Sequence, residues 1–137
     1  MDVSVKVTTM KRPATAKQAH TLLVIDDEPS ILRVITLALR NEGVNILTAT
    51  DGETALDLLS RKTPDLVITD VRLPGVDGVE IARRVKSNPQ LSSTSVLLIS
   101  AYGEPQDHPA DAFLAKPFAI EQLAAQVSEL LERRSGR

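Results

Sequence analysis

The sequence contains no cysteine and no tryptophan, and it has one tyrosine and two phenylalanines among 137 residues. Without cysteine the chain forms neither disulfides nor thiolate metal sites, which fits the cytoplasmic location that we expect. It also lacks a hydrophobic run long enough to span a membrane and an N-terminal stretch typical of a signal peptide. We therefore expect no membrane partner.

What is present fits a single folded domain, because 42% hydrophobic residues in a chain of 137 are enough for one core. The net charge of −2 is unevenly distributed. Residues 1–20 hold four basic side chains against one acidic, and residues 132–137 hold three against one, so the body between them is acidic. An acidic body argues against a dedicated nucleic-acid surface, and we expect no direct nucleic-acid partner. The predicted organisation is an N-terminal tail at 1–20, a domain at 21–132 and a C-terminal tail at 133–137.

Short apolar runs alternate with amphipathic segments along the body of the chain. The apolar runs predict buried strands at 21–25, 45–49, 65–69, 95–100 and 112–115. The amphipathic segments predict helices at 29–41, from a cap at Asp51 to about 60, at 77–87 and at 118–134. Strands that alternate with helices indicate an α/β fold, with a parallel sheet covered on both faces.

The segment between the last two predicted strands is unusual. Residues 101–111 contain Gly103, Pro105 and Pro109, and such a short segment with two prolines leaves room for one helical turn or none. The segment is either a compact loop that covers the sheet or part of an altered partner or dimer surface. We expect His108, between the prolines, to be exposed. All aromatic residues of the chain lie in or beside this segment: Tyr102, Phe113 and Phe118.

Near the N-terminus, Val3, Val5 and Val7 alternate with polar residues, a period-two pattern that is typical of a strand. Residues 3–8 can therefore add to a free sheet edge of the same or a neighbouring subunit. The alternative is a disordered tail, which is the state we expect.

Polar side chains follow four of the predicted strands at the point where each ends. Asp26 and Asp27 follow the first strand, Asp70 follows the third, Ser100 ends the fourth and Lys116 follows the fifth. In a doubly wound sheet the reactive crevice lies outside the carboxyl ends of the strands, so these side chains should lie close together. Three carboxylates repel one another unless protons or a cation neutralise them. Hard oxygen ligands without cysteine or a nearby histidine favour Mg²⁺.

An aspartate beside bound Mg²⁺ can attack phosphorus and form an aspartyl phosphate. A lysine and a hydroxyl must meet the charge on the transferred group, and Lys116 and Ser100 are of these types. Taken singly, each residue has a plainer explanation. The acidic pair could only cap a helix, Asp70 could be a turn residue, Ser100 a strand-end hydroxyl and Lys116 a solvated lysine. The joint arrangement is what favours a chemical site.

With these residues the chain resembles the receiver domains of bacterial response regulators, over roughly 21–131. Four motifs carry the resemblance: Asp26-Asp27, the loop from Asp70-Val71-Arg72-Leu73-Pro74-Gly75 to Gly78, Ser100-Ala101-Tyr102, and Phe113-Leu114-Ala115-Lys116-Pro117-Phe118. The resemblance implies a flavodoxin-like, doubly wound sheet of five parallel strands in the order 2-1-3-4-5, with helices on both faces. The fourth helix is expected to be missing or reduced. Among receivers, the chain is most similar to the single-domain, chemotaxis-regulator-like type.

The resemblance also implies roles for the motif residues in a two-component system. Asp70 would accept phosphate from a histidine kinase or a histidine phosphotransfer protein. Asp27 and Asp70 would bind Mg²⁺ directly, Asp26 would act through water, and the Arg72 carbonyl would be a further ligand. Lys116 would bridge Asp70 or its phosphate.

The remaining implied roles concern the response to phosphate. Ser100 would bond a phosphoryl oxygen, and Phe113 fits the aromatic switch that turns inward when the hydroxyl moves toward phosphate. The Lys116–Pro117 bond would be cis. Arg72 and Tyr102 are bulky and would flank the route of an attacking water, and our hypothesis is that they slow hydrolysis of the phosphate.

Such a receiver would signal by phosphotransfer or by altered binding of a downstream protein or a second copy, and would catalyse only its own phosphorylation and dephosphorylation. Because only 133–137 follow the last predicted helix, we expect no output domain. One alternative is an interaction module that works without phosphate, and the intact acidic pocket argues against it. Another is a small-molecule phosphohydrolase. Such enzymes usually have a second acid two residues past the nucleophile, where this chain has Arg72, and no substrate-capping insertion is present.

Overall fold

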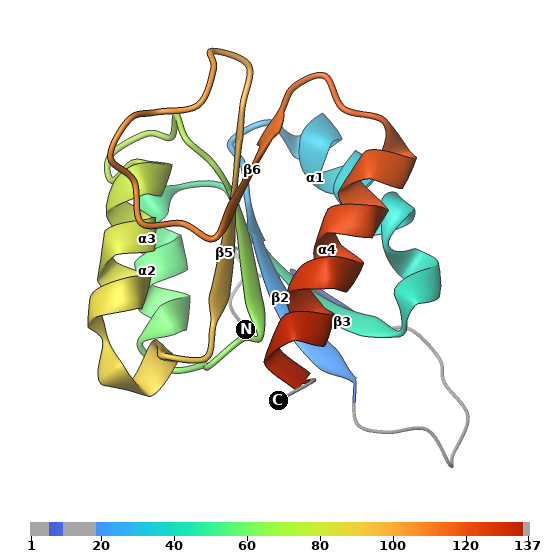
Figure 1. The fold of residues 1–137 in the computed structure, drawn as a ribbon, viewed down its shortest axis with the longest axis horizontal. Coiled ribbons are helices and arrows are strands. Elements are labelled where there is room, and N and C mark those ends of the chain that lie inside the picture. Colours follow the sequence, from blue (N-terminus) through green and yellow to red (C-terminus); the bar gives the residue numbers. More distant parts are fainter. Residues whose placement is uncertain (1–5, 10–18, 136–137) are drawn as a thin grey trace.

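The computed structural model describes residues 6–9 and 19–135, which form a sheet between two layers of helices (Figure 1). The first elements in chain order are β1 (Lys6–Thr9), β2 (His20–Ile25), α1 (Pro29–Ala38), the 3₁₀ turn η1 (Arg40–Glu42), β3 (Val44–Ala49) and α2 (Gly52–Leu59). They are followed by β4 (Leu66–Asp70), α3 (Gly78–Ser87), the 3₁₀ turn η2 (Pro89–Leu91), β5 (Ser95–Ser100), β6 (Ala112–Ala115) and α4 (Ile120–Ser135). No described helix is both long enough and apolar enough to cross a bilayer.

The sheet has the strand order β1-β3-β2-β4-β5-β6. Strands β3, β2, β4, β5 and β6 pair in parallel, which confirms the predicted five-stranded order 2-1-3-4-5. Helices α2 and α3 cover one face, and α1 and α4 cover the other (Figure 1). In β4, Leu66 and Ile68 pack into the core on the α1 and α4 side, whereas Val67 packs on the α2 and α3 side. The strand is apolar on both faces because both faces are covered.

Two predicted helix caps are present, and both lie next to the carboxyl edge of the sheet. The Asp51 side chain accepts a hydrogen bond of 2.7 Å from the Thr54 amide, and the Asp77 side chain accepts one of 2.9 Å from the Glu80 amide. These bonds satisfy amides that a helix leaves free in its first turn. They set where α2 and α3 begin after the loops that follow β3 and β4.

Two helix boundaries differ from the prediction because of local contacts. Helix α1 ends at Ala38, and the predicted remainder forms η1, which closes on Gly43 at a φ of +68°. This left-handed conformation turns the chain into β3. Helix α4 begins at Ile120 rather than at 118, and Phe118 packs against the core beneath α1 and α4.

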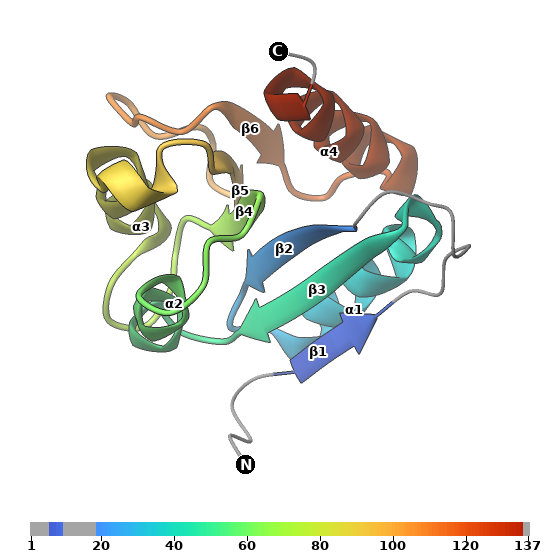
Figure 2. The ribbon, with the colours of Figure 1, turned by 90° about the horizontal axis from the view of Figure 1, so that it is seen from below.

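Residues 101–111, all of which the structure describes, contain no helix, as their prolines predicted. The segment is a loop on the α3 side of the sheet in both views (Figures 1 and 2). Asp111 fixes the C-terminal end of this loop to β5 and α3. One of its carboxylate oxygens accepts a hydrogen bond from the Val96 amide at 2.7 Å and forms a 2.7 Å ion pair with Lys86 of α3. The structure thus shows a loop at this position, and the reading of the segment as a partner or dimer surface stays a prediction.

The expectation that His108 is exposed is wrong, since only 10% of its side chain is accessible. Its Nδ1 accepts from the Ala110 amide at 3.1 Å, so Nε2 carries the proton and donates to the Glu104 carboxylate at 2.7 Å. Both partners come from the loop itself. The histidine therefore holds the loop together from within.

A sixth strand, β1, extends the sheet beyond β3 (Figure 2). It runs antiparallel, with Lys6 opposite Thr48 and Thr9 opposite Asn45. Residues 6–9 thus pair with their own chain, and for them the expectation of a disordered tail is wrong. The predicted strand at 3–8 overlaps β1 in part, and its first residues lie outside the described ranges.

Candidate functional site

The predicted acidic residues meet at the carboxyl edge of the parallel sheet. Asp26 follows β2, and its amide bonds to the Ala49 carbonyl at the end of β3. Its side chain is 2% exposed, and Oδ1 accepts from the Glu28 amide at 2.9 Å. Asp70 ends β4 with 12% of its side chain exposed, and Oδ1 accepts from the Arg72 amide at 3.3 Å. Each carboxylate is held by the turn that follows it.

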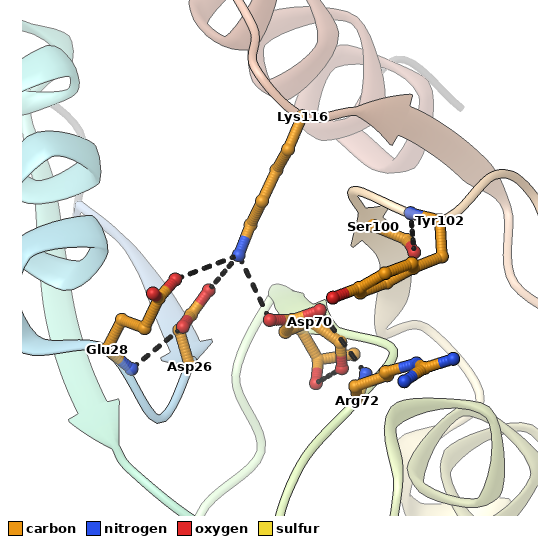
Figure 3. A network of polar contacts seen from close by, with 8 residues as sticks. Asp26, Glu28, Asp70, Arg72, Ser100, Tyr102 and Lys116 are labelled. Atoms are coloured by element: carbon orange, nitrogen blue, oxygen red, sulfur yellow. Dashed lines mark hydrogen bonds and ion pairs between the residues drawn. The ribbon is translucent and has the colours of Figure 1, made fainter.

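Lys116 joins these carboxylates from the other side of the pocket (Figure 3). Its amide bonds to the Ser100 carbonyl, which places the residue directly past the end of β6, and the Lys116–Pro117 peptide is cis. The ammonium donates to Asp26 Oδ2 at 2.9 Å and to Asp70 Oδ2 at 3.0 Å, and it lies 3.7 Å from Glu28 Oε1. One cation therefore faces three carboxylates.

The electrostatics of the pocket follow from burial and from this excess of acid. Burial raises the pKa of the Asp26 carboxyl above its usual value, and the charge of Asp70 adds to this, although the Glu28 amide and Lys116 act against it. Burial lowers the pKa of Lys116, but its hydrogen bonds to Asp26 and Asp70 outweigh that effect and raise the pKa. The lysine remains charged at neutral pH while the acidic side stays only partly neutralised.

The acidic residues fit a divalent cation. Asp26, Asp27 and Asp70 each offer a carboxylate oxygen, and these oxygens lie within 4.8 Å of one another. Asp27 is exposed while Asp26 is buried, so the cluster opens to solvent on one side. Oxygen ligands of this kind, with room for water, suit Mg²⁺. The donor set thus matches the ion predicted from the sequence.

Ser100 and Tyr102 line the other side of the pocket. The Ser100 side chain is buried and accepts a 3.0 Å hydrogen bond from the Tyr102 amide. Because a hydroxyl can donate and accept at once, Ser100 keeps its proton for a further acceptor. Phe113, on β6, is half-buried against the core on the α2 and α3 side.

Arg72 and Tyr102 are in contact, which the sequence did not show. The Arg72 guanidinium carbon lies 4.1 Å from the centre of the Tyr102 ring, although 73% of the tyrosine is exposed. Such a cation–π contact links the loop after β4 to the loop after β5. Figure 3 shows both side chains beside Asp70.

Glu28 is a residue of the pocket that the sequence motifs did not single out. The structure brings its carboxylate to Lys116 with 61% of the side chain exposed, at the mouth of the pocket. Its position directly after the acidic pair was the signal that could have identified it.

The family of this chain follows from its similarity to known proteins. The family model described as "Response regulator receiver domain" matches residues 22–128. The chain belongs to this family, whose receiver domains partner with histidine kinases and bind Mg²⁺ at an acidic pocket. Strand β1 lies before the matched region.

Individual relatives agree with this assignment. The chain is 39% identical over 123 residues to the probable transcriptional regulatory protein TcrX of Mycobacterium tuberculosis, covering 85% of this chain and 51% of TcrX. It is 34% identical over 118 residues to the DNA-binding dual master transcriptional regulator RpaA of Synechocystis, covering 82% of this chain and 49% of RpaA. The chain thus spans about half the length of the curated relatives it matches.

Solved structures show the same fold. A putative response regulator from Chloroflexus aurantiacus superposes with a TM-score of 0.78 at 34% identity, over 84% of this chain and 99% of that one. The chemotaxis response regulator CheY4 of Vibrio cholerae superposes with a TM-score of 0.75 at 27% identity, over 82% and 98%.

Proposed function

We propose that the chain is a phosphoacceptor receiver that takes a phosphoryl group onto Asp70 from a histidine kinase or a histidine phosphotransfer protein. The observation that carries this proposal is the Lys116 ammonium held between Asp26 and Asp70, at 2.9 and 3.0 Å. Asp70 ends the central strand β4, and 12% of its side chain is exposed against 2% for Asp26, so it is fixed while partly accessible. A nucleophile needs this combination of rigidity and access.

Transfer forms a bond between an Asp70 carboxylate oxygen and phosphorus while the bond from phosphorus to the donor breaks, and the donor leaves with the electron pair. Negative charge spreads over the transferred phosphoryl oxygens. Lys116 already contacts the attacking carboxylate and meets that charge, and the Ser100 hydroxyl donates to one of the oxygens. Asp27 and Asp70 would hold Mg²⁺ directly, Asp26 through water, and the Arg72 carbonyl would complete the set. The ion would neutralise charge on the phosphoryl group.

The signal would pass through Ser100 and Phe113. In the structure the Ser100 hydroxyl is engaged by the Tyr102 amide, and Phe113 is half-buried beside the loop 101–111. Movement of the hydroxyl toward a phosphoryl oxygen would change the position of this loop and favour the inward packing of Phe113. Phosphorylation then shifts the population between two packings. Downstream proteins or a second copy would distinguish them.

Arg72 and Tyr102 would set the lifetime of the phosphate. Their stacked side chains lie beside Asp70, where an attacking water would have to approach. A stacked pair excludes water better than either chain alone, since each limits the motion of the other. We therefore propose slow hydrolysis.

We propose that the response to phosphorylation is produced by proteins or chain segments outside the receiver domain. TcrX and RpaA are named as regulators of transcription, and RpaA as DNA-binding, but each is about twice as long as the aligned region. We propose that the receiver itself contacts protein partners, and that any contact with DNA is made elsewhere.

The test is phosphorylation by a small donor. The protein is incubated with Mg²⁺ and acetyl phosphate and its intact mass is measured. We expect the mass of one phosphoryl group on the wild type and none on Asp70→Asn. Asp77→Asn is the matched control, because it removes a carboxylate from the same loop while asparagine still caps α3. Equal labelling of the wild type and Asp70→Asn would refute the assignment, and an unlabelled protein that still binds its partner would support a module that works without phosphate.

A further inference from the structure

Glu28 is a charged side chain of the pocket that the proposed transfer does not use. It follows the acidic pair at the N-terminal boundary of α1, and its side chain caps no helix amide. Its carboxylate lies 3.7 Å from the Lys116 ammonium and is 61% exposed, whereas Asp26 and Asp70 contact the same ammonium from more buried positions. Figure 3 shows Glu28 on the Asp26 side of Lys116, facing Asp70 across the ammonium.

We propose that Glu28 determines which phosphodonors can charge Asp70, by disfavouring small free anions. This inference rests on the proposed phosphoacceptor role of Asp70. The pocket already holds Asp26, Asp27 and Asp70 against one lysine. Glu28 adds a further negative charge at the entrance, so a free anionic donor meets repulsion there. A donor carried on a protein surface has its own contacts to offset this repulsion.

The geometry sets the size of the effect. The nearest oxygens of Glu28 and Asp70 are bridged by one ammonium nitrogen, so a donor phosphorus aligned on Asp70 lies roughly 6 Å from the Glu28 charge. Two unit charges about 6 Å apart in water repel one another enough to slow a reaction about threefold. For a dianionic donor facing the single charge of Glu28, the same repulsion slows the reaction about tenfold. The effect must therefore grow with the charge of the donor. It must also fade in about 1 M salt, where the screening length is only about 3 Å.

The same charge attracts a cation. Removing the Glu28 charge should weaken Mg²⁺ binding by up to about tenfold, the factor for a doubly charged ion at about 6 Å, while it accelerates phosphorylation at saturating Mg²⁺. A variant with a distorted pocket would instead show both weaker Mg²⁺ binding and slower phosphorylation. The opposite signs therefore distinguish an electrostatic role of Glu28 from a structural one.

The experiment compares Glu28→Gln with Glu28→Asp and Glu42→Gln. Glu28→Asp keeps the charge, and Glu42→Gln makes the same charge change at an exposed residue of η1, next to the opposite edge of the sheet. The initial rate of Asp70 phosphorylation is measured by intact mass, with acetyl phosphate as dianion and phosphoramidate as monoanion. Mg²⁺ affinity is measured separately, without donor, from the thermal stabilisation it produces.

We expect Glu28→Gln to react about tenfold faster with acetyl phosphate and about threefold faster with phosphoramidate at low salt, with weaker Mg²⁺ binding. Both controls should stay near the wild type, and the gain should disappear in high salt. If Glu28→Gln reacts at the wild-type rate, or if both donors gain equally, this inference is overturned while the role of Asp70 stands. If the wild type takes up no phosphoryl group, the proposed function and this inference fail together.

Discussion

The close contact between Gly78 and the end of β4 leads to a specific prediction about stability. Gly78 is the first residue of α3, and its amide bonds to the Val71 carbonyl at 2.8 Å. A Cβ atom added there would lie 2.1 Å from the Asp70 carbonyl oxygen and 3.0 Å from its carbon. All these neighbours are backbone, so Gly78→Ala can be accommodated only if α3 and the Asp70 turn move apart.

The required movement sets the expected cost. Relief of a 2.1 Å contact needs a shift of about 1 Å between two rigid segments, and overpacking of this kind costs about 1–3 kcal/mol. The alanine gains back about 0.5 kcal/mol, because it reduces the entropy of the unfolded chain. The net loss is about 1.5 kcal/mol, which lowers the melting temperature of a domain of this size by roughly 6 °C.

Gly43→Ala is the comparison, since Gly43 has a φ of +68° and nothing within 4 Å of an added Cβ. Its cost is the left-handed conformation alone, about 1 kcal/mol. Thermal unfolding followed by circular dichroism should rank wild type above Gly43→Ala and Gly43→Ala above Gly78→Ala. Only Gly78→Ala should also slow phosphorylation of Asp70, by tenfold or more, because a nucleophile displaced by about 1 Å loses its alignment. A melting temperature for Gly78→Ala within about 2 °C of the wild type would refute the reasoning.

Further predictions concern the pocket. Mg²⁺ at about 100 times its dissociation constant should stabilise the wild type by roughly 2.7 kcal/mol, and Asp27→Asn should lose most of this gain in a thermal shift measurement. Arg72→Ala and Tyr102→Ala should each shorten the half-life of the phosphorylated protein several-fold, measured by decay of the labelled mass, and an unchanged half-life in both would count against the proposed lifetime role. Tyr102 is the only tyrosine in a chain without tryptophan, so its fluorescence should report phosphorylation directly, and a signal identical before and after labelling would contradict movement of that loop. Because burial raises the pKa of Asp26, the native state holds its proton more tightly than the unfolded chain, and ionisation of Asp26 costs stability above the native pKa. Asp26→Asn should thus be more stable than the wild type near neutral pH. This gain should shrink as the pH falls through the native pKa of Asp26 and should be lost below the unfolded value of 3.8, as denaturant unfolding at several pH values would show.

Local patterns predicted most of the fold. The apolar runs marked the five parallel strands, and Asp51 and Asp77 marked two helix starts, because a cap acts within three residues of the chain. The predicted ends of α1 and α4 were less accurate. Helix propensity does not capture the turn that closes on Gly43 after α1, nor the core contact of Phe118 before α4. His108 was misjudged for a similar reason, because its burial depends on how a short loop folds back on Glu104 and Ala110.

By itself, the sequence determined that Asp26, Asp27, Asp70, Ser100 and Lys116 would share one edge of a sheet, because parallel strands with buried faces place their carboxyl ends together. It did not determine how these groups engage one another. Lys116 lies 90 residues from Asp26 and 46 residues from Asp70 in the sequence, yet it contacts both. Its contact with a third carboxylate, that of Glu28, is visible only in the structure. The contact between Arg72 and Tyr102 likewise joins two loops whose positions depend on packing of the whole domain. Only the tertiary structure decided these pairings, because side chains on separate strands meet at bonding distance only after the core has placed their backbones.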